Sequence, residues 1–187
     1  MRILQIAAIL LLATCALANN FPPAGSNYNN FPTVENPLSQ GGWWVNGGAV
    51  GLDWRDCKVV AGGKVEATGI NLTTDDSICS LIGTWGPSQQ AQATVIAIAG
   101  YHNEVELRLN SVIAAHSSTG YEFNCSNAYQ QIVRWNGALG NFDILVDDHS
   151  HHCVNGDVFK VTSVIQANGS IQLTSFINGV QINTIND

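Results

Sequence analysis

The sequence predicts an all-β protein, built as an antiparallel β-sandwich. Beyond residue 37 the 187-residue chain is a series of short apolar or alternating runs, separated by clusters of Gly, Asn, Asp and Ser. These runs recur about every ten residues, which is typical of sandwiches and barrels. Gly62-Gly63 and Asn178-Gly179 are hairpin signals, because both central residues of the favoured two-residue turn need a positive φ.

The start of the chain, residues 1–18, is interpreted as a secretory signal peptide. It combines a basic Arg2, an apolar run over 3–12 and the small-x-small sequence Ala16-Leu17-Ala18. The apolar run is too short to span a bilayer, and no later segment reaches the required length. We therefore expect a secreted chain with no membrane span.

The charge balance excludes one class of partner. The net charge is −7 at neutral pH, and loss of Arg2 with the signal peptide makes the mature chain more negative. Electrostatic attraction to nucleic acid or to an anionic membrane is therefore not expected. Residues 19–37 are rich in Asn, Pro and Gly without periodicity and predict a flexible N-terminal arm. Residues 38–187 are then one domain with a sizeable core.

The expected strands follow in chain order from the alternating and apolar runs. They are 43–45, 58–60, 64–67, 90–99, 104–110, 121–125, 129–135, 142–146, 158–166, 171–177 and 181–185. The run 90–99 ends in a wholly apolar stretch, which predicts a central strand covered on both faces. From residue 121 onward we expect a meander of sequential antiparallel neighbours.

The strand 104–110 is the most informative. Val105, Leu107 and Leu109 alternate with Glu104, Glu106 and Arg108, so one face enters a core and the other carries ionisable groups. Only 11% of the residues are charged, which makes three of them on one face of one strand the expected site. Glu122 is expected to pair with Arg108 or Arg134 on the same polar face.

Aromatic residues suit the stacking of sugar rings, and the chain has five tryptophans. Trp135 ends a strand and is followed at once by Asn136-Gly137, which predicts a ring and an amide at a loop rim. The other tryptophans are expected in the core.

Four cysteines remain after the signal peptide, which indicates two disulfides with three possible connectivities. If strands 121–125, 129–135 and 142–146 are sequential neighbours, the chain after 146 returns to the end of the sheet that holds Cys125. We therefore predict Cys125–Cys153 and, by elimination, Cys57–Cys79.

Two further features concern metals and glycans. Asp147, Asp148, His149 and His151 form the one dense group of possible metal ligands, which can hold a transition metal or, with backbone carbonyls, calcium. A solvated loop is the alternative, and no cofactor is assigned. Glycosylation acceptor sequences begin at Asn71, Asn124 and Asn168. Asn124 is expected to stay unmodified, because it shares the polar face with Glu122.

Several segments together resemble the concanavalin A-like lectin/glucanase superfamily, in particular secreted jelly-roll domains of the laminin-G-like type. The resemblance is carried by Glu35–Leu38, Glu104–Arg108, Gly120–Phe123, Ile132–Gly137, Asn155–Val158 and Phe176–Val180. It implies a concanavalin A-like jelly roll over about 35–187, and it indicates the fold more than the activity.

The superfamily contains glycoside hydrolases, polysaccharide lyases and non-catalytic lectins. The hydrolases carry three spaced acids on one strand; Glu104 and Glu106 match the first two, but Leu109, or Arg108 in the shorter motif, replaces the third. The lyase pattern is matched less well, because Val133 stands where its catalytic histidine would be. The resemblance therefore leaves binding and hydrolysis open.

The function predicted first is binding of a carbohydrate on the face of Glu104, Glu106, Arg108 and Glu122, with Trp135 and Asn136 at its rim. Arg108 is expected to keep both glutamates ionised, so that neither can protonate a leaving group. The alternatives are a glycoside hydrolase that acts on a β-glucan with Glu104 and Glu106, and a structural or adhesive extracellular protein.

Overall fold

The computed structural model describes residues 29–69, 76–98 and 104–187. The predicted signal peptide and Asn71 lie outside this part of the chain. The described strands are β1 (Trp44–Asn46), β2 (Cys57–Val60), β3 (Lys64–Ala67), β4 (Cys79–Leu81), β5 (Gln89–Thr94), β6 (Glu104–Ala114), β7 (Ser117–Ser126), β8 (Gln130–Gly137), β9 (Phe142–Asp148), β10 (Val158–Ile165), β11 (Ile171–Ile177) and β12 (Val180–Asn186). A 3-10 helix, η2 (Gly47–Val50), is the one helix among them, and no described helix is long and apolar enough to cross a membrane.

Two four-stranded antiparallel sheets form the body of the molecule. One has the order β6-β7-β8-β9, and the other has the order β12-β11-β10-β5. Their facing sides share a core in which Phe123 and Ile132 of the first sheet meet Phe159, Val161 and Leu173 of the second. The all-β antiparallel architecture is therefore as predicted, and it is consistent with a sandwich.

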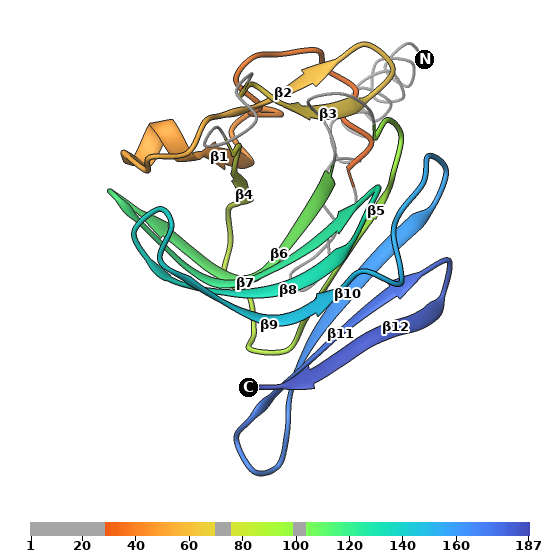
Figure 1. The fold of residues 1–187 in the computed structure, drawn as a ribbon. Coiled ribbons are helices and arrows are strands. Elements are labelled where there is room, and N and C mark those ends of the chain that lie inside the picture. Colours follow the sequence, from red (N-terminus) through yellow and green to blue (C-terminus); the bar gives the residue numbers. More distant parts are fainter. Residues whose placement is uncertain (1–28, 70–75, 99–103) are drawn as a thin grey trace, which may run out of the picture.

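The sheet of β6–β9 is strongly curved, and its concave side faces the elements β1–β4 and η2 (Figure 1). We call the described residues from the start of β1 to the end of β4, 44–69 and 76–81, the N-terminal cap. The cap consists of two small ribbons, β1-β4 and β2-β3. Leu52, Trp54 and Ile78 of the cap pack against Val133 and Trp135 of β8. The cap thus packs on part of the concave face through an apolar cluster that is separate from the core between the two sheets.

The alternation predicted for β6 places its two kinds of side chain on opposite sides of this sheet. Val105 and Leu107 pack against the core between the sheets, where Leu109 is buried, and Glu104 and Glu106 line the concave side. The pattern ends at a β-bulge, where the pairing with β7 shifts between Leu109 and Val112.

Several boundaries differ from those expected. β4 was not predicted, because it has only three residues and follows a polar segment. β5 ends at Thr94 and is an edge strand of its sheet rather than a central one. Ile96, beyond its end, is exposed, so the apolar run does not continue as a covered strand.

The meander is confirmed within each sheet but not between them. β7, β8 and β9 are sequential neighbours, and so are β10, β11 and β12. The chain changes sheets between β9 and β10. The hairpin at Asn178-Gly179 is confirmed, with φ of 51° and 81°, while β10 and β11 are joined by the longer turn that contains Asn168.

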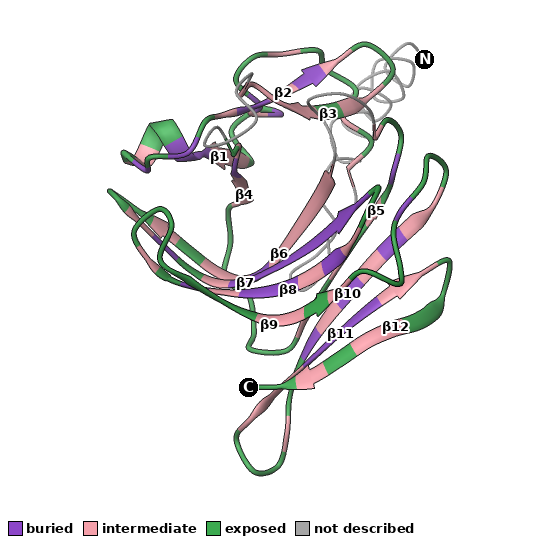
Figure 2. Cartoon of the chain, in the orientation of Figure 1, coloured by how far each residue is buried: buried purple, intermediate pink, exposed green. Residues whose placement is uncertain are grey.

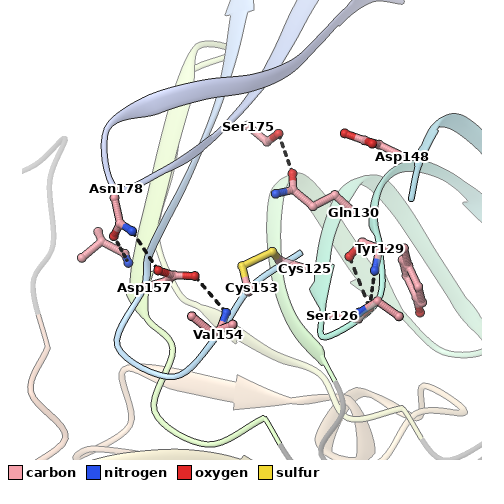
Figure 3. The surroundings of a disulfide bond; sticks show 12 residues. Cys125, Ser126, Tyr129, Gln130, Asp148, Cys153, Val154, Asp157, Ser175 and Asn178 are labelled. Carbon is pink, nitrogen blue, oxygen red and sulfur yellow. Dashed lines mark hydrogen bonds between the residues drawn. A yellow bond between two sulfur atoms is a disulfide. The ribbon is translucent and has the colours of Figure 1, made fainter. Parts of the chain in front are cut away.

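The predicted disulfide Cys125–Cys153 is present, with a Cα–Cα distance of 5.6 Å (Figure 3). It ties the end of β7 to the segment that crosses between the sheets, and both cysteines are fully buried. Asp157 accepts a hydrogen bond from the backbone N–H of Val154 at 2.8 Å and another from Nδ2 of Asn178 at 2.8 Å. The crossing segment is therefore fixed on both sides.

The second predicted bridge is not formed. Cys57 and Cys79 are free thiols on β2 and β4, and Cys57 is hydrogen-bonded to Cys79. Residues 29–37 also differ from the flexible arm expected for 19–37. Glu35 forms a β-bridge with Val59, and its carboxylate accepts the backbone N–H groups of Ser39 and Gln40. The two backbone hydrogen bonds between Glu35 and Val59 attach the segment to β2 of the cap.

Candidate functional site

A cavity of about 390 Å³ opens on the concave face of the β6–β9 sheet. Its lining comes from all four strands, from the loops beside them and from the cap. The lining residues are Asp76, Glu104, Glu106, Glu122, Asn124, Tyr129, Gln131, Val133, Trp135, Leu139, Gly140 and Phe142. Three of the residues predicted for the polar face, Glu104, Glu106 and Glu122, are thus brought together. Figure 2 shows that β7 and β8, which cross the middle of the sheet, carry many of its buried residues.

Glu122 anchors the buried part of the site. Its Oε2 lies 3.2 Å from Nη1 of Arg108 and accepts the indole N–H of Trp135 at 2.8 Å. The Arg108 guanidinium also lies over the Trp135 ring, 5.3 Å from its centroid, and donates to Oγ of Ser118. Burial raises the pKa of Glu122, an effect that Arg108 and Trp135 oppose.

Glu122 was expected to pair with Arg108 or Arg134, and the structure pairs it with Arg108. The other candidate, Arg134, lies elsewhere and is bound to Asp143 and Asp187. Arg108 does not line the cavity itself; it contacts two lining residues, Glu122 and Trp135. The ion pair is consequently a structural part of the site.

Trp135 lies in the site but not at its rim. Only 4% of its surface is exposed, because it packs against Trp54 of the cap with ring centroids 4.9 Å apart. The exposed ring is that of Phe142, with 43% of its surface accessible and its centroid 5.0 Å from that of Trp135. The exposed aromatic ring at the rim is thus that of Phe142 on the neighbouring strand, and not that of Trp135 as predicted.

Glu104 is held by a hydrogen bond from the Tyr129 hydroxyl to its Oε2, at 2.6 Å. Burial raises the pKa of Glu104; the hydrogen bond from Tyr129 lowers it, and the charge of Asp76 raises it further. Tyr129 was predicted to begin a strand and had no assigned role. It is the residue that fixes the first carboxylate.

Glu106 has the most perturbed carboxyl group in the site. Burial raises its pKa well above the usual value, and the charges of Glu122, Asp76 and Glu104 raise it further, while Arg108 lowers it. Arg108 was expected to keep Glu106 ionised, but its lowering of the Glu106 pKa is outweighed. The arginine is engaged by Glu122, and burial with three like charges has the larger effect.

The remaining predicted residues lie outside the cavity. The side chain of Asn136 donates to Asp143 at 3.0 Å. Asp147 accepts a hydrogen bond from Gln131, and Asp148 accepts from His151. His149 lies near Asp147 at 3.2 Å. Within the described parts of the chain, no three of the His, Cys, Asp and Glu side chains are placed to hold a metal ion.

Sequence reasoning also missed residues that the fold brings to the cavity. Asp76 precedes β4, whose strand was not predicted, so no pattern connected it with β6. Gln131 and Asn124 were noted for other reasons, although both alternate in phase with residues of the polar face. Oδ1 of Asn124 is buried and has no hydrogen-bond partner in the structure. The site as a whole can accept hydrogen bonds from a polar ligand and place an apolar face against Phe142.

No family model, no curated protein and no solved structure matches this chain.

Proposed function

We propose that this protein binds a carbohydrate in the cavity on the concave face. We also propose that its sandwich is a concanavalin A-like jelly roll, and that the chain is secreted. The resemblance of the sequence segments named above supports the fold, and the disulfide Cys125–Cys153 is compatible with an extracellular location.

The observation that carries the proposal is the composition of the cavity wall. It combines four carboxyl groups and two side-chain amides with the exposed ring of Phe142. Saccharides present hydroxyl groups around the ring edge and apolar CH groups on the ring face. A wall of acceptors beside an aromatic ring is complementary to both.

The affinity of a neutral saccharide should be weak. A hydrogen bond to a charged group contributes about 1.5–3 kcal/mol against the cost of desolvation. A few such bonds, reduced by the cost of immobilising the ligand, correspond to dissociation constants of roughly micromolar to millimolar.

Calorimetric titration of a panel of oligosaccharides tests the proposal. Phe142→Ala should weaken binding about tenfold or more, because it removes the stacking ring. Val180→Ala, an exposed aliphatic truncation at the β11–β12 hairpin, is the matched control and should leave binding unchanged. Equal binding by wild type and both variants would place the ligand elsewhere, and no binding by any saccharide would refute the function.

A second candidate is glycoside hydrolysis, and the raised pKa of Glu106 is the observation that favours it. A carboxyl group whose pKa is raised keeps its proton to a higher pH and is therefore better suited to donate it to a leaving group. Glu104, hydrogen-bonded to Tyr129, stands two residues away on the same face, and neighbouring carboxylates are the arrangement that retaining hydrolysis needs. The missing third acid of the hydrolase motif weighs against this candidate.

Release of reducing ends from a β-glucan distinguishes the two candidates. Binding alone predicts no release above the level of a Glu106→Gln variant. Steady release that Glu106→Gln and Glu104→Gln abolish, and that Glu66→Gln in the cap does not, would establish hydrolysis instead.

A further inference from the structure

We infer that the ligand of the cavity is an amino sugar, a saccharide whose free ammonium group binds among the carboxylates of the concave face. The inference rests on the proposed function and adds to it the chemical class of the ligand. It is carried by the imbalance between acceptors and donors in the cavity wall and by a buried acceptor without a partner.

The wall accepts hydrogen bonds far more than it donates them. Asp76, Glu104, Glu106 and Glu122 contribute carboxyl groups, and no lysine, arginine or histidine is among the described residues that line the cavity. The guanidinium of Arg108, which does not line the cavity, is engaged by Glu122 and Ser118. The Tyr129 hydroxyl donates to Glu104, and the Trp135 indole donates to Glu122. Two donors of the wall are therefore already used within it.

Asn124 provides a second and independent observation. Its side chain lines the cavity with 8% of its surface exposed, and its Oδ1 has no hydrogen-bond partner. A buried acceptor without a partner costs free energy that a donor of the ligand would recover. Asn124 lies opposite Glu106 in the pairing of β6 with β7. The residue with the unmet acceptor is thus the cross-strand neighbour of the residue with the central carboxyl group.

Charge selects an ammonium over a hydroxyl as that donor. The carboxyl groups of Asp76, Glu104 and Glu122 all act on Glu106 and disfavour its ionised form. A bound ammonium donates three hydrogen bonds and carries the opposite charge, so it relieves this repulsion where a neutral hydroxyl cannot. A uronate or sulfated sugar would add to the repulsion and is expected to be rejected.

Binding of a cation next to Glu106 should also release a proton. The ammonium favours the ionised carboxylate, so the carboxyl proton passes to the buffer. Several titratable groups interact electrostatically with Glu106. They come from the cap, from the sheet and from the loop beside it, and they are Cys57, Asp76, Glu104, Arg108, Glu122 and Tyr129. A neutral saccharide in the same place leaves this balance nearly unchanged.

The test compares three tetrasaccharides of one linkage at pH 6, namely β-1,4-linked glucosamine, N-acetylglucosamine and glucose. Calorimetric titration of the whole protein in two buffers of different ionisation enthalpy gives both affinity and proton release. We expect the glucosamine tetramer to bind about tenfold more tightly than the others, equivalent to about 1.4 kcal/mol. We expect proton release for that ligand alone.

Variants locate the ammonium. Glu106→Gln should abolish the preference and the proton release, and Glu66→Gln, which removes a carboxylate outside the cavity, should leave both intact. The proton release of the wild type decides the question even if Glu106→Gln does not fold. Equal or tighter binding of the neutral tetramers would overturn the amino-sugar inference while carbohydrate binding stands. Failure of all three to bind would overturn the inference, while the wider oligosaccharide panel decides whether carbohydrate binding itself stands. A preference that survives Glu106→Gln would also overturn the inference.

Discussion

The carboxyl group of Glu106 determines how the site responds to pH. Its neighbours Glu104, Glu122 and Asp76 stand close enough for their charges to raise its pKa, and burial acts in the same direction. The protonated form of such a group is tolerated in the folded protein, whereas its ionised form lowers the free energy of unfolding. The ionised site therefore destabilises the fold, which is common for binding sites.

The pH dependence of folding should show this cost. The folded state holds the Glu106 proton above the usual pKa of 4.5, so this residue destabilises the fold progressively as the pH rises through its raised pKa. Glu106→Gln should therefore match wild type near pH 4 and become more stable than wild type towards pH 8. The gain is about 1.4 kcal/mol for each unit by which the pKa is raised.

Urea unfolding of both proteins at several pH values measures this difference. Glu66→Gln, which also removes one negative charge, serves as the control for overall charge. The difference in unfolding free energy between Glu106→Gln and wild type could instead stay constant with pH, or shrink as the pH rises. Either result would show that Arg108 keeps Glu106 ionised in the fold, as the sequence had led us to expect.

At the scale of the elements, the bulge in β6 limits the row of ionisable side chains. Asn110 follows Arg108 in the alternating pattern, but the bulge directs it to the other sheet, where its Oδ1 accepts a hydrogen bond from Ser163 of β10 at 2.6 Å. Gly120 of β7 lies against this bulge with a φ of 105°. The bulge and the glycine together connect the two sheets at this end.

Gly120→Ala should destabilise the protein markedly. A Cβ at Gly120 would lie 2.5 Å from the backbone oxygen of Asn110, and the positive φ adds a cost of about 1–2 kcal/mol. Gly179→Ala is a matched control, because its φ is also positive while nothing lies within 4 Å of the added Cβ. Denaturant unfolding should rank Gly120→Ala below Gly179→Ala by more than about 1 kcal/mol; equal losses would mean that the bulge yields freely.

Alternation on single strands explains how much of the site was predictable. Val105 and Glu106 were placed on the correct faces because a period of two is a local property of a strand. The bulge after Leu109 was not, because it depends on how Gly120 meets Asn110 across the hairpin. Trp135 was assigned to the rim because no local pattern reveals the cap that buries it.

The same limit appears at the scale of the whole molecule. The strands of both sheets were largely predicted, since their runs and turns are local. In the cap, β1, β2 and β3 were also predicted, but the pairing of β1 with β4 was not, because it spans a long stretch of chain and β4 has only three residues. Asp76 could not be connected with Glu106 for this reason. The disulfide Cys125–Cys153 was predictable, because it follows from three sequential strands.

The cap offers a further prediction, which concerns its two thiols. The hydrogen bond with Cys79, together with burial and the charge of Glu106, raises the pKa of the Cys57 thiol. A raised pKa slows thiolate chemistry, yet the two sulfurs face one another across β2 and β4. Oxidised glutathione should therefore join them slowly, as each thiol loses its proton and the pair gives two electrons to the oxidant. The new bridge should stabilise the cap by about 3 kcal/mol.

Peptide mapping without reduction checks the thiol prediction. A Cys57–Cys79 peptide should accumulate together with the Cys125–Cys153 peptide. A Cys79–Cys125 peptide, or two thiols that remain open to alkylation after prolonged oxidation, would contradict it.

The central claim is that a saccharide binds between the cap and the concave face. A crystal structure of the protein soaked with the glucosamine tetramer tests it most directly. We predict a sugar ring against Phe142, with its ammonium within hydrogen-bond distance of Glu106 and Oδ1 of Asn124. A saccharide bound on the outer face of β10–β12, with the concave cavity holding only water, would contradict the claim.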